Sequence, residues 1–271
     1  MQELLANQVI QSSAAPFLVG LVVAGILFPV RLGGLAAGAG FLAAVWMIGA
    51  FGLTPLTASR KIVVLGAAAP VLGALADLAF KPTRATAPVL GALFGAGAIW
   101  VFWSVLSQRP AADAALLGAG VVGFVLWTVA FTVSLRDQPV RAGAAGLFLG
   151  LGAGVGGVLG ATAQLGQYGL ALGAACGAFL LLVMILGKRV FAGATFTLAA
   201  SVAAALIAVG AMVLAKLPWT SLAAIALIPL AVRLPVPEKS PPWIQAIVAS
   251  LYALAPAAGA WALAWQSSRA A

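Results

Sequence analysis

The chain has 271 residues, of which 64% are hydrophobic and 7% charged, and its mean hydropathy is +1.16. A soluble domain carries about 25% charged residues, so this composition excludes a water-exposed globule and predicts a membrane protein. The basic residues behind the formal charge of +9 lie one or two at a time in short loops. That pattern is typical of topology signals and lipid headgroup contacts, and no nucleic-acid partner is expected.

Apolar segments follow one another along the chain, and most approach the roughly 20 residues that a helix needs to cross a bilayer. The loops between them are short, so consecutive helices must be neighbours. We therefore expect an all-α transmembrane bundle of about ten helices without a soluble domain: a tail at 1–14, the bundle at 15–265 and a tail at 266–271. The predicted spans are 15–30, 32–53, 62–80, 87–106, 114–135, 142–164, 168–186, 192–214, 219–232 and 243–265.

Two of these segments are short for a membrane span. The first and the ninth, 15–30 and 219–232, have only about 15 apolar residues each. Each is either a short span or a re-entrant or interfacial segment, so eight or nine crossings remain alternatives to ten. Residues 1–14 carry Glu3 but no Lys or Arg, and no cleaved secretory signal is therefore expected.

Positive charges predict the orientation, because cytoplasmic loops carry an excess of Lys and Arg. With ten crossings, nine of the 14 basic residues fall in one set of alternate loops and five in the other. The larger set predicts the cytoplasmic side, which places both termini outside the cell inner membrane. The larger set is Arg31, Lys81, Arg84, Arg136, Arg141, Lys188, Arg189, Arg233 and Lys239; the smaller is Arg60, Lys61, Arg109, Lys216 and Arg269.

Glycines at steps of four form the strongest local pattern, in segments 142–164 and 168–186. Residues four apart share one helix face, and glycine there lets two backbones approach closely in lipid. We expect a tightly packed glycine-zipper hairpin. The alternative is that these faces line a moving interface or a substrate path. The glycines are Gly146, Gly150, Gly154, Gly169, Gly173 and Gly177.

Prolines and one carboxylate are the other candidates inside the spans. Pro70, Pro229 and Pro256 each remove a helix hydrogen bond and are candidate hinges. Asp77, the acidic residue within a predicted span, is a weak candidate polar site. An ion pair with Lys81 four residues on explains Asp77 without a function, and proton or cation coupling is the alternative. Gln164, beside the glycine hairpin, is expected at the membrane interface or as a hydrogen-bonding group for a ligand.

Missing residue types narrow the chemistry. The chain has no histidine, so ordinary haem ligation, His-containing zinc sites and imidazole acid–base catalysis are excluded. The single cysteine, Cys176, permits neither an internal disulfide nor a Cys-only metal site. No phosphate-cradling Gly-Lys-Ser/Thr motif occurs. We therefore expect no enzyme, no catalytic residue, no metal and no cofactor.

Two functions remain open. The first is a small non-ATP-driven transporter of an uncharged, amphipathic or lipid-like substrate, indicated by many spans, short loops, kinking prolines and glycine-lined interfaces. Its layout is similar to that of the ten-helix drug/metabolite exporters, although their amino terminus usually lies inside. The second is a structural or assembly subunit of a larger membrane complex, which needs no ionisable interior. Membrane lipids, and in the second case other membrane subunits, are the expected partners.

Overall fold

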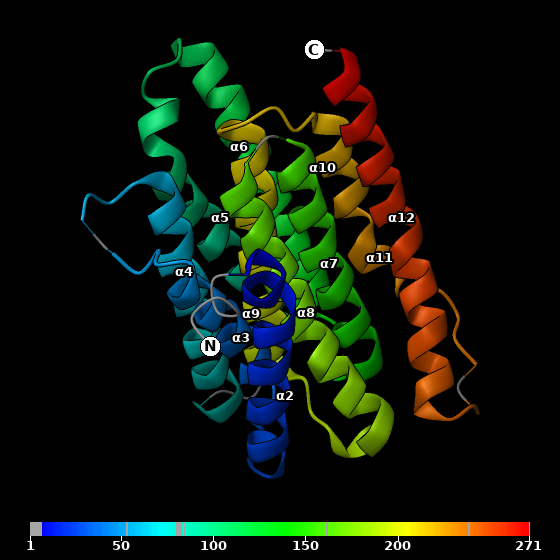
Figure 1. Ribbon diagram of the computed structural model, residues 1–271. Helices are drawn as coiled ribbons and strands as arrows, with labels where there is room; N and C mark the ends of the chain where they lie inside the picture. The colour runs from blue at the N-terminus through cyan, green and yellow to red at the C-terminus, as the bar shows by residue number, and fades with distance from the viewer. Residues whose placement is uncertain are drawn as a thin grey trace.

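The computed structural model describes residues 7–52, 54–79, 83, 85–160, 162–237 and 239–270, and within these ranges the chain is helical without strands. The predicted all-α bundle is confirmed (Figure 1). The helices are η1 (Ile10–Ala14), α2 (Ala15–Leu27), η2 (Phe28–Val30), α3 (Leu35–Met47), α4 (Ala58–Ala79), α5 (Thr86–Leu106), α6 (Ala111–Val133), α7 (Pro139–Leu159), α8 (Ala163–Leu186), η3 (Gly187–Arg189), α9 (Gly193–Val213), α10 (Trp219–Ala226), α11 (Ile228–Ala231) and α12 (Pro242–Ala270).

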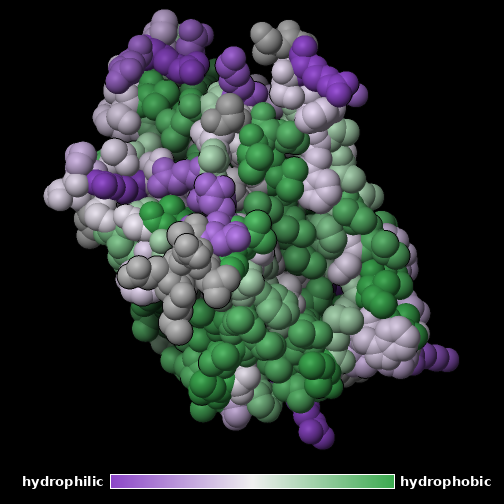
Figure 2. Space-filling view, in the orientation of Figure 1, coloured by the Kyte–Doolittle hydropathy of each residue, from purple (hydrophilic) through white to green (hydrophobic). Residues whose placement is uncertain are grey.

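Successive helical segments alternate in direction. Within the described ranges eight helices are long and apolar enough to cross a membrane, and two shorter apolar segments, Leu35–Met47 and Trp219–Ala231, complete the series. The chain is therefore a multi-pass membrane protein. Figure 2 shows a broad hydrophobic face, with hydrophilic residues gathered along the upper and left parts of the molecule and single ones at the lower margin.

The first helix is longer than the sequence predicted. It extends back to Ile10 and spans 21 residues to Val30, because polar residues before position 15 join it. The Ser12 hydroxyl donates to the carbonyl of Gln8 at 2.7 Å, and the Ser13 hydroxyl donates to that of Val9. A hydroxyl that bonds a carbonyl one turn back can enter a helix in lipid, so the first segment is not a short span.

The second segment is shorter than the predicted span 32–53. The helix α3 starts after Gly33 and Gly34 and covers only 13 residues. Past its end, Gly49 adopts a φ of +75°. A left-handed residue just past a helix commonly ends it. The sequence after Met47 is still apolar, so hydropathy did not predict this helix end.

The ninth segment is short, as predicted, and it is interrupted between α10 and α11. Pro229 lacks the N–H that would continue the helical hydrogen bonds. The N–H of Leu230 donates to the carbonyl of Leu227 at 3.1 Å instead of to that of Ala226, four residues back. The Trp127 indole of α6 donates to that carbonyl at 3.0 Å. A side chain of a neighbouring helix thus satisfies a backbone group that lipid cannot.

The helix α9 lies at the centre of the bundle. Of its most apolar window, 89% is buried, and every residue from Gly193 to Ala211 is buried. It contacts α3, α4, α5, α6, α7 and α8. Its alanine-rich sequence lets these helices approach from all sides, so the middle of the molecule is solid packing.

Candidate functional site

Alternation of the helices gathers most basic side chains at one end of the bundle, which we call the basic end. It consists of the links α2–α3, α6–α7, α8–α9 and α11–α12 and the first turn of α7, and it holds six of the eleven basic side chains that the structure describes: Arg31, Arg136, Arg141, Arg189, Arg233 and Lys239. The other five, Arg60, Lys61, Arg109, Lys216 and Arg269, lie toward the opposite end. Lys81, Arg84 and the side chain of Lys188 lie outside the described part of the chain.

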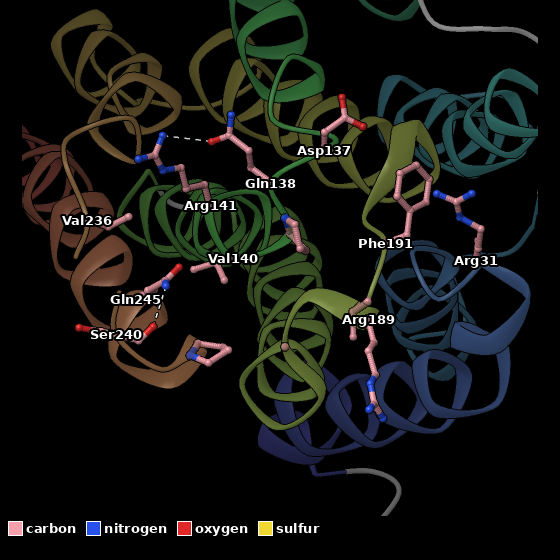
Figure 3. Close-up of a pocket in the computed structure, with 14 residues that line it drawn as sticks. Arg31, Asp137, Gln138, Val140, Arg141, Arg189, Phe191, Val236, Ser240 and Gln245 are labelled. Atoms are coloured by element: carbon pink, nitrogen blue, oxygen red, sulfur yellow. Dashed lines mark hydrogen bonds between the residues drawn. The ribbon is translucent and has the colours of Figure 1, made fainter. Parts of the chain in front are cut away.

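A cavity of about 810 Å³ opens at the basic end. We call it the basic pocket (Figure 3). Segments far apart in sequence line it: Arg31, residues 137–141 where α7 begins, residues 187 and 189–191 after α8, and residues 236, 240, 242 and 245 around the start of α12. Val140, Val190, Phe191 and Val236 supply apolar wall, so the pocket is amphipathic.

Three arginines from three separate parts of the chain line the pocket: Arg31 between α2 and α3, Arg141 in the first turn of α7, and Arg189 after α8. The Arg31 guanidinium carbon lies 4.6 Å from the centroid of the Phe191 ring. Arg141 donates to the Gln138 side-chain oxygen at 3.1 Å. Arg189 follows the last turn of α8, and no hydrogen bond or ion pair joins it to another described residue. Figure 3 shows these side chains on different sides of the cavity.

Negative charge does not balance these cations within the described lining. Asp137 is the acidic residue there, its side chain is 71% exposed, and Arg136 already pairs with it at 3.4 Å. Arg233 lies close enough for the charge of Arg141 to add to the effect of burial, and together they lower the Arg233 pKa. Arg233 donates to the Phe131 carbonyl at 3.3 Å and to the Ser134 hydroxyl.

Two of the long helices that begin at the basic end, α7 and α9, differ in how their free N–H groups are satisfied. At α9, the Asp77 carboxylate of α4 accepts bonds from Ala194 N and Thr195 N, both at 2.8 Å, and from the Thr195 hydroxyl at 2.6 Å. At α7, Gln138 stands in the capping position without a side-chain capping bond. Helix starts carry partial positive charge. At α9 the Asp77 carboxylate neutralises this charge, whereas at α7 no side-chain cap does so and the helix start faces the basic pocket.

The two weak polar candidates, Asp77 and Gln164, lie at opposite ends of the bundle. Asp77 joins α4 to α9 at the basic end, whereas Gln164 in the first turn of α8 donates to the Tyr168 hydroxyl at 2.8 Å. The expected partner of Asp77, Lys81, lies outside the described residues. Sequence reasoning missed the partners that the structure gives Asp77, because they are backbone groups more than a hundred positions away.

The glycines of α7 and α8 lie along the most extensive helix contact in the described part of the chain. A Cβ atom built on Gly150 would lie 2.4 Å from Gly173 N, and one on Gly154 would lie 2.5 Å from Leu170 N. A Cβ on Gly169 would lie 2.4 Å from the Gly154 backbone. Backbones this close leave no room for a substrate between them, which favours packing over a path.

Two of the six predicted glycines, Gly146 and Gly177, meet side chains and not the backbone of the partner helix. A Cβ on Gly146 would meet Cys176 Sγ and Phe196 Cζ at 3.0 Å, and one on Gly177 would meet only Leu147, at 3.5 Å. The close backbone contact between α7 and α8, which we call the α7–α8 seam, continues instead through Gly157 and Gly166, where a Cβ on Gly157 would lie 2.9 Å from Gly166 N. Their steps of three complete the helical period of 3.6, which a search for steps of four misses.

The candidate hinge prolines differ in their surroundings. Pro70 lies inside the continuous helix α4, and its ring fills the space beside Gly38, where a Cβ would lie 2.7 Å away. Pro256 lies inside the continuous helix α12. Pro229 is the one of these three that accompanies a break in the described chain, between α10 and α11.

The helix α12 carries a stripe of buried alanines three or four residues apart, which places them on one face. The helix contacts α7, α8, α10 and α11, and the basic pocket lies where α7 and α12 begin. The space between α7 and α12 we call the α7–α12 seam. The alanines are Ala246, Ala249, Ala253, Ala257, Ala260 and Ala264.

Among the described residues no group of three or more His, Cys, Asp or Glu side chains could hold a metal ion. The chain matches no family model, no curated protein and no solved structure.

Proposed function

We propose that the protein is a non-ATP-driven transporter of an amphipathic, lipid-like substrate in the cell inner membrane. The observation that carries this proposal is the basic pocket, an open cavity of about 810 Å³ that combines arginines with apolar side chains. Ligand pockets commonly have volumes of about 300–1,000 Å³ and a few placed polar groups.

We place the route for the apolar part of the substrate along the α7–α12 seam, which would have to open for the substrate to pass. It leads from the pocket, where Val140 and Gln245 lie in the lining, along the alanine stripe of α12. The substrate head would occupy the pocket while its tail stays among the lipid chains.

Movement of a fluorescent lipid between leaflets tests this proposal. The protein is reconstituted into vesicles that contain a headgroup-labelled phospholipid, and a membrane-impermeant reductant then quenches the outer label. We expect a larger quenched fraction with the protein than in protein-free vesicles made in parallel. Equal quenching in the two preparations contradicts the proposal.

A structural or assembly subunit is the second candidate, and the solid packing around α9 favours it. All side chains from Gly193 to Ala211 are buried, so the centre holds no described passage between the two ends. Under this alternative the protein purified in a mild detergent should carry partner proteins in fixed ratio. A chain that purifies alone, and that moves lipid in vesicles, would exclude it.

A further inference from the structure

We infer that the basic pocket binds the phosphate of an anionic membrane lipid. The inference deepens the proposed function, on which it rests for the identity of this lipid as the substrate. The pocket gathers Arg31, Arg141 and Arg189 around one cavity, and the single described carboxylate in its lining, Asp137, is turned to Arg136. Beside an uncharged headgroup, no further carboxylate among the described lining residues would balance these cations, whereas a phosphate diester supplies the counter-charge.

The arginines retain the donors that such a ligand needs. A guanidinium has five N–H donors in a planar fork that suits phosphate oxygens. Arg31 uses the face of its guanidinium on Phe191, which leaves the N–H edge available. Arg141 has one bond to Gln138, and Arg189 has none to a described residue. Figure 3 shows the three side chains at separate positions around the lining, so a headgroup in the pocket has a guanidinium on more than one side of it.

The uncapped start of α7 adds a second source of positive potential. Gln138, Pro139, Val140 and Arg141 all line the pocket. Pro139 has no N–H, so Val140 and Arg141 carry the first N–H groups of α7, and such groups favour an anion beside them. The chain itself supplies that anion at α9 through Asp77. At α7 no described side chain does so, and a lipid phosphate in the pocket would take the equivalent place.

A lipid fits the pocket better than a free phosphate ester. Val140, Val190, Phe191 and Val236 form part of the wall, and a small ion would leave this apolar surface against water. The pocket also lies where the apolar helices α7 and α12 begin, which is the depth at which lipid headgroups lie. Basic pockets between transmembrane helices at this depth are suited to acidic headgroups.

Lipid binding to the purified protein tests the inference independently of transport. Native mass spectrometry counts bound dioctanoyl phosphatidylglycerol, with dioctanoyl phosphatidylcholine and inorganic phosphate as the other probes. The pocket variant is Arg141→Gln with Arg189→Gln. The control variant, Lys216→Gln with Arg269→Gln, removes the same charge at the opposite end. A third protein, with Arg141→Lys and Arg189→Lys, keeps the charge and loses the fork.

We expect phosphatidylglycerol to bind the wild type in preference to phosphatidylcholine. The pocket variant should bind it about 30-fold more weakly, at about 1 kcal/mol for each basic residue lost near an anionic lipid. The control should stay close to wild type, and the lysine variant should fall between them. If the variant with both glutamines does not fold, the variant with both lysines, which has the same net charge as the wild type, must still bind phosphatidylglycerol more weakly than the wild type.

Three results would overturn the inference. Equal losses in the pocket and control variants would mean diffuse attraction without a site. Unchanged binding in the pocket variant would place the lipid elsewhere. Displacement of phosphatidylglycerol by inorganic phosphate at comparable concentration would make the ligand a soluble phosphate. Selective lipid binding without movement of lipid between leaflets would uphold the site and contradict the proposed transport.

Discussion

Replacing Gly154 with alanine tests whether the α7–α8 seam is held by backbone contact. The new Cβ would lie 2.5 Å from Leu170 N and 2.8 Å from Gly169 C. Both partners are backbone atoms, so α8 must move away from α7 to relieve the overlap. Overpacking of this kind costs about 1–3 kcal/mol, against a gain of up to about 1 kcal/mol from the better helix propensity of alanine.

Gly123→Ala is the matched control. Gly123 lies in α6, and a Cβ there would have nothing within 4 Å. The propensity gain is common to both variants, so the difference between their free energies of unfolding isolates the overlap, about 1–3 kcal/mol. Both are measured by denaturant titration in the same mixed micelles. A Gly154→Ala protein as stable as Gly123→Ala would refute the packing role and revive the substrate path.

The remaining predictions concern single contacts and orientation. Asp77→Ala should destabilise the protein by about 0.5–2 kcal/mol, as loss of a helix cap does, and speed amide exchange in the first turn of α9; Asp77→Asn, which keeps an acceptor, should do less. Equal amide exchange in the first turn of α9 in both variants and the wild type would refute the capping role of Asp77. Trp127→Phe should cost about 1 kcal/mol, because the Ala226 carbonyl loses its donor, and an unchanged unfolding curve would contradict it. In a Cys176→Ala background, Arg189→Cys should react with impermeant thiol reagents only from the cytoplasmic side, and labelling of intact cells from outside would reverse the predicted orientation.

Hydropathy predicts the number and order of helical segments well, because each crossing needs a long apolar run. It fails at the ends of helices, where a few polar contacts decide. Ser12 and Ser13 read as part of a polar tail, and their bonds to the preceding turn make them part of the first helix. Gly49 reads as one more small residue, and its left-handed backbone marks the end of α3.

The candidate site was less accessible from the sequence. Steps of four predict that Gly150 and Gly154 share a face. The backbone atoms that these glycines contact, and the steps of three to Gly157 and Gly166, can be seen only once the two helices are packed together. The basic pocket leaves still less trace. Arg31 and Arg141 are more than a hundred positions apart, and each reads as an ordinary loop charge until the bundle brings the links together.

In the proposed transport, a lipid-like substrate enters the basic pocket by its anionic head. The most direct measurement compares two labelled lipids with identical acyl chains, one with an anionic phosphoglycerol head and one with a zwitterionic phosphocholine head, in vesicles that contain the protein. We expect faster leaflet exchange of the anionic lipid, and loss of that preference in the variant with Arg141→Gln and Arg189→Gln. Equal exchange of both lipids by wild type, or a preference that persists in the variant, would contradict it.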